Sequence, residues 1–183
     1  MANKEFHVKT NITYSEDCTK RYILDVCWNQ NLPIATVVMV QPTRESNGVA
    51  YDDTINRCLN MLYSYGYGRA YFVNLLCNFE GEESNNCKEN WEYIKGCINI
   101  STDVILAYGA MYGLKQSLKA GVLGSLAASL KDCINYNKRY HVLTANEKIC
   151  MPTVNGAKIE SRTFDEILEL LGEKRESGDN GQK

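Results

Sequence analysis

The sequence lacks the close pairs of cysteine and histidine that form structural metal sites. Its eight cysteines are scattered, no two are separated by only two residues, and the chain has two histidines, His7 and His141. A structural zinc site ordinarily needs two close ligand pairs. We therefore predict no metal site and no cofactor, and we expect reduced cysteines that pack as small hydrophobic residues. Cys77 and Cys150 lie near predicted strand ends, where one reactive thiol could be exposed.

A charge excess and a long apolar segment are also missing. The formal net charge is −2 and the pI is about 5.8, which argues against long nucleic acid as the main partner. The first ten residues are polar, and the longest apolar run, Ala120 to Leu130, is too short to cross a bilayer. We expect a cytoplasmic protein without a membrane segment.

The chain contains no GxSxG, HExxH or GxGxxG motif. These motifs carry the nucleophile of many hydrolases, the zinc ligands of many metalloproteases and the phosphate-binding turn of dinucleotide enzymes. Their absence leaves Asp52 and Asp53 as the candidate catalytic residues, because these carboxylates follow a strand and open a predicted helix.

What the sequence does contain is a regular alternation of strands and helices. Buried strands are predicted at residues 36–40, 70–76, 103–107 and 139–143, helices at 53–64, 88–100, 113–135 and 163–171, and two further strands at 10–14 and 21–28. This order predicts one three-layer α/β domain over residues 1–172, with a mostly parallel sheet covered by helices on both faces. The charged, glycine-bearing residues 173–183 are predicted to be a disordered tail.

Polar residues stand where the predicted strands end. They are Gln41-Pro42-Thr43, Asn74, Tyr108-Gly109 and Asn146. The carboxyl ends of parallel strands meet at one edge of a sheet, where α/β proteins bind ligands. A carboxamide places a donor beside an acceptor, the pattern that reads a nucleobase edge. Tyr108 can offer a stacking face, and Gly109 allows a close approach to the backbone.

Structural explanations for the same residues remain open. Asn74 could tie its own loop to a neighbouring strand, and Gln41-Pro42 could do no more than end a strand. Asp52 and Asp53 could act only as caps of the helix that they open.

Several short motifs are spread over about residues 21–152. They are Arg21-Tyr22-x-Leu24 with Trp28, Gln41-Pro42-Thr43, Asp52-x-Thr54-Ile55-x-Arg57-Cys58, Gly66-Tyr67-Gly68, Val73-Asn74-Leu75 and Ala107-Tyr108-Gly109. In their order and spacing, these motifs together resemble the family called domain of unknown function 1643. Two positions depart from the pattern. The family usually has Asn-Pro-Ser-Thr in place of Gln41-Pro42-Thr43-Arg44, and His-Pro in place of Met151-Pro152.

The layout of that family is similar to the uracil-DNA glycosylase fold. The resemblance implies that Gln41 lies at the loop that positions water, that Asn74 reads the base, and that Met151 stands where a histidine belongs. Arg44 and Thr54, which lie in the compared segments, join the predicted binding residues. A thioether neither carries charge nor donates a useful hydrogen bond, so Met151 cannot stabilise a leaving anion.

Three functions compete at this point. The leading one is a pocket for a nucleotide or nucleobase-like molecule, with catalysis reduced or absent, which would sequester or sense a nucleotide signal. The second is an N-glycosidase or nucleotide hydrolase that uses Asp52 or Asp53 as base. The third is an interaction module, because the helix at 113–135 carries small residues that would permit a homodimer.

Overall fold

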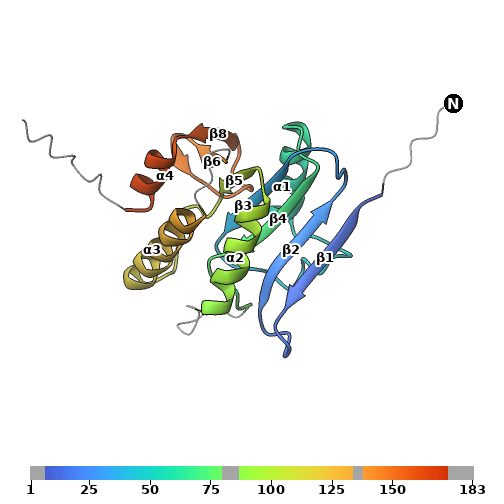
Figure 1. The fold of residues 1–183 in the computed structure, drawn as a ribbon, viewed down its shortest axis with the longest axis horizontal. Helices are drawn as coiled ribbons and strands as arrows, with labels where there is room; N and C mark the ends of the chain where they lie inside the picture. Colours follow the sequence, from blue (N-terminus) through green and yellow to red (C-terminus); the bar gives the residue numbers. More distant parts are fainter. Residues whose placement is uncertain (1–6, 80–86, 134–137, 173–183) are drawn as a thin grey trace, which may run out of the picture.

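The computed structural model describes residues 7–79, 87–133 and 138–172. The predicted tail at 173–183 and the acidic loop at 80–83 lie outside these residues. The described part holds an eight-stranded sheet and four helices (Figure 1). In chain order they are β1 (Lys9–Tyr14), β2 (Arg21–Cys27), β3 (Ile34–Met39), α1 (Asp53–Ser64), β4 (Arg69–Asn74), α2 (Lys88–Ile100), β5 (Asp103–Leu106), α3 (Gln116–Asp132), β6 (Arg139–Ala145), β7 (Lys148–Ile149), β8 (Lys158–Arg162) and α4 (Phe164–Leu170).

The sheet is parallel in its centre and antiparallel on both sides. Its order is β1-β2-β4-β3-β5-β6-β7, and β8 also pairs with β6. The pairs β4–β3, β3–β5 and β5–β6 are parallel, whereas β1–β2, β2–β4, β6–β7 and β6–β8 are antiparallel. The predicted α/β class is confirmed, but the sheet is more mixed than predicted. The strands β7 and β8 were missed because they are short and half-exposed.

The connections between the central strands reverse direction at β3. The crossover through α1 leads from β3 to β4 on one side, and the crossover through α2 returns past β3 to β5 on the other. The carboxyl ends of β3 and β5 therefore flank a topological switch point. Open α/β sheets bind their ligands in the crevice outside the strands at such a point.

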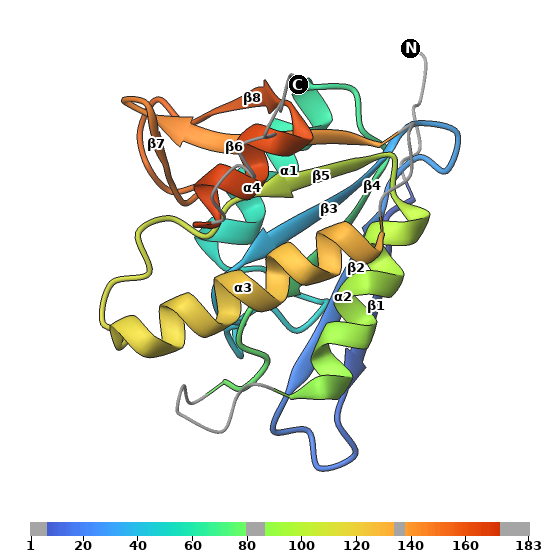
Figure 2. The same cartoon turned by 60° about the vertical axis from the view of Figure 1, so that its left-hand side comes forward.

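Helices cover both faces of the sheet (Figure 2). Helices α2, α3 and α4 pack on one face with Val38, Val73 and Leu106, and α1 packs on the other with Val37 and Phe72. Successive residues of a strand point to opposite faces. A strand buried on both faces therefore reads as an uninterrupted apolar run, which is why the central strands could be predicted.

The helix boundaries follow local chemistry. Asp52 caps α1, since its side chain accepts a hydrogen bond from the Ile55 amide. Helix α3 begins three residues later than predicted, because Met111 and Gly113 have φ values of 49° and 82°, which no helical residue adopts.

Two other predictions concern the surface: an exposed reactive thiol and a homodimer face on α3. Cys77 and Cys150 are buried, so neither presents the exposed thiol that their positions suggested. On α3, Gly121 and Gly124 are exposed and Ala127 is buried, and the homodimer stays a prediction. Within the described ranges, no helix combines the length and the apolar character needed to cross a membrane.

Candidate functional site

A cavity of about 490 Å³ opens at the carboxyl ends of the central strands. This volume lies in the range of about 300–1,000 Å³ that is usual for small-molecule sites. Its lining brings together eight of the residues predicted from sequence: Gln41, Thr43, Asp52, Thr54, Asn74, Tyr108, Gly109 and Met151. The cavity thus occupies the switch point between β3 and β5.

Four predicted residues do not line this cavity. Pro42 is buried beside it, whereas Arg44 is exposed and places its guanidinium 4.6 Å from the centre of the Phe79 ring. Asp53 is exposed on the first turn of α1. Asn146 has a φ of 50° and occupies the two-residue turn between β6 and β7, a place that suits asparagine for conformational reasons.

Asp52 is held by several hydrogen bonds. One carboxylate oxygen accepts from the Ile55 amide at 2.8 Å, and the other accepts from the Thr43 hydroxyl. Burial alone would raise the pKa of Asp52, but these hydrogen bonds outweigh it and lower the pKa below its usual value. Asp52 is therefore an ionised cap at neutral pH and a weak base.

Gln41 fastens the segment that follows β4. Its Nε2 donates to the carbonyl oxygens of Asn78 and Phe79, at 3.1 and 3.0 Å. The family resemblance places Gln41 at a water-positioning loop. In the structure its amide instead holds the segment after β4 in place and so supports one wall of the cavity.

Asn74 lies at the end of β4, is 1% exposed, and is only partly satisfied. Its Oδ1 accepts a hydrogen bond from Nη2 of Arg21 at 3.2 Å, and its backbone carbonyl accepts from Nδ2 of Asn90 at 2.9 Å. The Nδ2 of Asn74 itself is buried and has no hydrogen-bond partner among the described residues. A buried donor left in this state costs about 1–3 kcal/mol.

Arg21 is a lining residue that the sequence reasoning did not select. It is the first residue of β2, and because β2 runs antiparallel to β4, its start lies at the carboxyl end of the central strands. Its side chain is 2% exposed, and Nη1 donates to the Ser46 carbonyl at 3.1 Å. An arginine at the start of a predicted strand was the available signal.

Tyr108 and Gly109 shape the wall that follows β5. Tyr108 is buried, and burial raises the pKa of its phenol to about 12, so the ring is neutral at neutral pH. Gly109 has a φ of 60°, and a Cβ there would lie 3.0 Å from Cγ of Met151. The glycine therefore lets the Met151 loop close against β5.

The family comparison agrees with the motifs in the sequence. A profile described as "Protein of unknown function (DUF1643)" matches residues 21–148, which is well over half of the 183 residues. The chain belongs to the DUF1643 family. Neither curated proteins nor solved structures gave a match to the chain.

In this DUF1643 chain the matched segment begins at Arg21 and ends at Lys148, and both residues line the cavity. Met151 lies beyond the match, so the comparison does not define which residue of the family it replaces. Lys148 belongs to β7, a strand too short to predict, and is exposed. The charged residues that line the cavity are therefore two cations and one carboxylate, Asp52.

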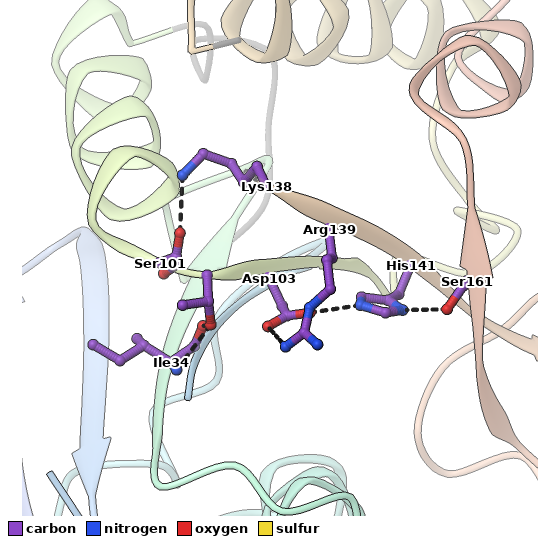
Figure 3. Close-up of polar contacts among 8 residues, drawn as sticks. Ile34, Ser101, Asp103, Lys138, Arg139, His141 and Ser161 are labelled. Carbon is purple, nitrogen blue, oxygen red and sulfur yellow. Dashed lines mark hydrogen bonds and ion pairs between the residues drawn. The ribbon is translucent and has the colours of Figure 1, made fainter. Parts of the chain in front are cut away.

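A second cluster of buried polar residues lies at the opposite, amino-terminal end of the DUF1643 sheet (Figure 3). Asp103 opens β5, is fully buried, and accepts from Arg139 at 2.8 Å and from Nε2 of His141 at 2.7 Å. Nδ1 of His141 lies 3.3 Å from the Ser161 hydroxyl. Burial would raise the pKa of Asp103, but hydrogen bonds from His141 and Arg139 outweigh it and lower the pKa to about 2.

This cluster stabilises the sheet. A serine, a histidine and an aspartate in series also occur in nucleophilic hydrolases. Here, however, Arg139 shares the carboxylate, and His141 and Ser161 are directly opposed in the β6–β8 ladder. None of these residues lines the described cavity. The series therefore links neighbouring strands through side-chain hydrogen bonds.

Proposed function

We propose that this protein binds a nucleotide or nucleobase-like small molecule in the cavity at the carboxyl ends of β3, β4 and β5, and that catalysis is reduced or absent. The observation that carries the proposal is the Asn74 side chain beside a cavity of about 490 Å³ at the switch point. Asn74 is 1% exposed, and its Nδ2 is buried with no hydrogen-bond partner among the described residues. A ligand acceptor would satisfy this donor.

The other walls support the same class of ligand. The Tyr108 ring is neutral and lies on the opposite side of the switch point from Asn74, so it offers an apolar face to a planar group. Methionine side chains from positions 39, 111 and 151 add adaptable apolar surface. A base-sized ring and a few directed hydrogen bonds suit this lining.

An N-glycosidase related to uracil-DNA glycosylases is the alternative, and the geometry supports it less. Both oxygens of Asp52 already accept hydrogen bonds, and Asp53 lies outside the lining. Met151 cannot stabilise a leaving anion. Incubation with nucleosides, nucleotides and uracil-containing DNA should release no base; release that is abolished in Asp52→Asn would restore the enzymatic alternative.

The biological role that we propose is sequestration or sensing of a nucleotide signal in the cytoplasm. A binding protein with little catalysis changes the free concentration of its ligand, or reports it through a change in its own stability.

The direct test is a thermal-shift screen with nucleobases, nucleosides, nucleotides and cyclic nucleotides, followed by calorimetry of any hit. Thr54→Glu adds a carboxylate to the cavity wall at the first turn of α1, where an acidic residue suits the helix dipole. Asn60→Glu adds the same charge to an exposed position of the same helix. We expect stabilisation in the wild type and Asn60→Glu and its loss in Thr54→Glu. Absence of any stabilising compound would overturn the proposal.

A further inference from the structure

We propose that the ligand carries an oxyanion, a phosphate or a carboxylate, and that Arg21 and Asn74 bind this group at the buried end of the cavity. The inference rests on the proposed function and narrows it, because it favours a nucleotide over a nucleoside. It assigns a ligand-binding role to Arg21, which belongs to the first of the family motifs but is not among the binding residues predicted from the sequence.

The first argument is that the charge of Arg21 is buried without a carboxylate hydrogen-bonded to it. A guanidinium remains protonated in proteins, and this one is 2% exposed. Its hydrogen-bond acceptors are the Ser46 carbonyl at 3.1 Å and Oδ1 of Asn74 at 3.2 Å, both neutral. Within the described residues it forms no ion pair with a carboxylate. The Asp52 carboxylate attracts this guanidinium electrostatically but accepts its hydrogen bonds from Thr43 and the Ile55 amide. Burial of a charge that no carboxylate pairs directly is costly, so a bound anion that accepted hydrogen bonds from the guanidinium would offset this cost.

The second argument is the surplus of donors. Arginine has five N–H groups, and the two hydrogen bonds of Arg21 leave three of them without an acceptor in the described residues; Nε is buried and unpaired. Both N–H groups of the Asn74 amide are unpaired as well. The acceptor of that amide, in contrast, is already engaged by Arg21.

This arrangement favours an anion over a neutral base edge at the buried end. The free groups of Arg21 and Asn74 are all donors, and most nucleobase edges present donors as well as acceptors; the guanine edge with two acceptors, O6 and N7, is neutral. Phosphate and carboxylate oxygens only accept, and their hydrogen bonds with a guanidinium are about twice as strong as neutral ones. The base would then lie toward Tyr108 and the more open Met151, which is 40% exposed.

The remaining charges of the lining are compatible with an anion. Asp52 attracts Arg21 electrostatically, but its carboxylate oxygens accept hydrogen bonds from Thr43 and from the Ile55 amide at the helix cap. Lys148 is exposed at the rim, forms no ion pair within the described ranges, and adds a second positive charge. The lining therefore has a net positive charge, although the whole chain has a formal charge of −2.

Calorimetry at constant ionic strength tests the inference. The probes are inorganic phosphate, succinate, and matched pairs of a nucleoside and its 5′-monophosphate. We expect each monophosphate that binds to exceed its nucleoside by about tenfold or more in affinity, and phosphate to compete with it. A stronger effect of succinate than of phosphate would identify a carboxylate as the preferred anion.

Asn74→Asp is the most informative variant, because it places a carboxylate of nearly the same shape beside Arg21. We expect its melting temperature to be equal or higher, since Arg21 gains an internal counter-charge, and its affinity for phosphate to fall about tenfold or more. If Asn74→Asp is as stable as the wild type, its loss of phosphate binding cannot be explained by misfolding. Asn146→Asp makes the same change in the exposed β6–β7 turn and should bind phosphate as the wild type does.

Arg21→Lys provides a second check, since it keeps the charge and loses the planar fork of donors. We expect intermediate affinity for phosphate, between that of the wild type and that of Asn74→Asp. Wild-type affinity in Asn74→Asp would overturn the inference.

The two proposals can fail separately. If nucleosides bind as tightly as their monophosphates and phosphate does not compete, the anion inference falls and the proposed function stands. If phosphate or succinate binds in an Asn74-dependent manner but no base-containing compound does, the proposed function falls and the anion site stands. If none of the probes binds, both fall.

Discussion

The two ends of the parallel strands both bury polar side chains, but they balance charge differently. At the amino-terminal end, Asp103 has Arg139 and His141 within 2.8 Å, and its charge is compensated inside the protein. At the carboxyl end, Arg21 has only neutral acceptors, and the Asn74 amide has unpaired donors. Buried polar groups are normally satisfied, so the end that is not satisfied is the better candidate for a ligand site.

The difference also separates stability from function. A compensated cluster lowers the free energy of the folded state without help, and its removal should destabilise the protein. A cluster with unpaired buried donors contributes little to stability until a ligand supplies their acceptors. Variants at the amino-terminal end should therefore lose stability and keep ligand binding. Variants at the carboxyl end should keep stability and lose ligand binding, and experiments can test this contrast.

Asp103→Ala should give the largest loss of stability. It removes a buried carboxylate and leaves the buried His141 Nε2 without its acceptor, whereas the exposed Arg139 can turn to water. We expect a decrease of about 3 kcal/mol in the free energy of unfolding, measured by urea denaturation. Nucleotide binding, measured at a temperature where the variant is folded, should change little, because Asp103 does not line the cavity. Unchanged stability would refute the structural role of the cluster.

Acid should weaken the same cluster. The hydrogen bonds that Asp103 accepts lower its pKa from 3.8 to about 2 in the folded state. A lowered folded-state pKa contributes stability that is complete above the unfolded pKa and is lost as the pH falls toward the folded one. The stability difference between wild type and Asp103→Asn should therefore shrink as the pH falls from about 3.8 to about 2. Thermal melts across this range measure it; a constant difference would contradict the assignment.

Arg21→Met should change stability much less than Asp103→Ala. Two hydrogen bonds to neutral acceptors are lost, but the cost of burying an unpaired charge is removed as well. We expect a change in the free energy of unfolding within about 1 kcal/mol, together with loss of phosphate binding. A loss as large as that of Asp103→Ala would mean that Arg21 is needed for the fold, and the contrast between the two ends would disappear.

The smallest expected effect concerns cysteine labelling. Cys150 lines the cavity and is 7% exposed, and burial raises the pKa of its thiol, so it should react slowly with a maleimide. A bound nucleotide should slow the reaction further by a few-fold. Cys133, which is also buried but does not line the cavity, is the control and should be unaffected. Equal protection of both thiols would indicate global stabilisation instead of local cover.

The sequence was informative wherever a local rule decides the structure. The apolar runs of the central strands, the Asp52 cap and helix α2 were all predicted, because burial on both faces and helix capping leave direct marks on neighbouring residues. Placement of Asn74 and Tyr108 at one edge followed from parallel pairing alone.

The remainder depends on pairing that no local pattern encodes. Arg21 joins the site only because β2 is antiparallel to β4, and the sequence gives the strand without its direction. Lys148 and Cys150 join it through β7, which has two residues and too little periodicity to detect. Asn146 does not line the cavity, because a residue just past a strand can belong to a tight turn instead of the site, and its binding role stays a prediction.

The cavity is complete only when β2 is paired antiparallel with β4. Arg21 comes from the strand that extends the sheet beyond β4, and Asn74 comes from the parallel core itself. A core that formed without β2 would keep Asn74 and lose the cation beside it. An anion bound by both residues would thus stabilise the pairing of β1 and β2 with the rest of the sheet. Ligand affinity would in turn depend on how stably β2 is paired with β4.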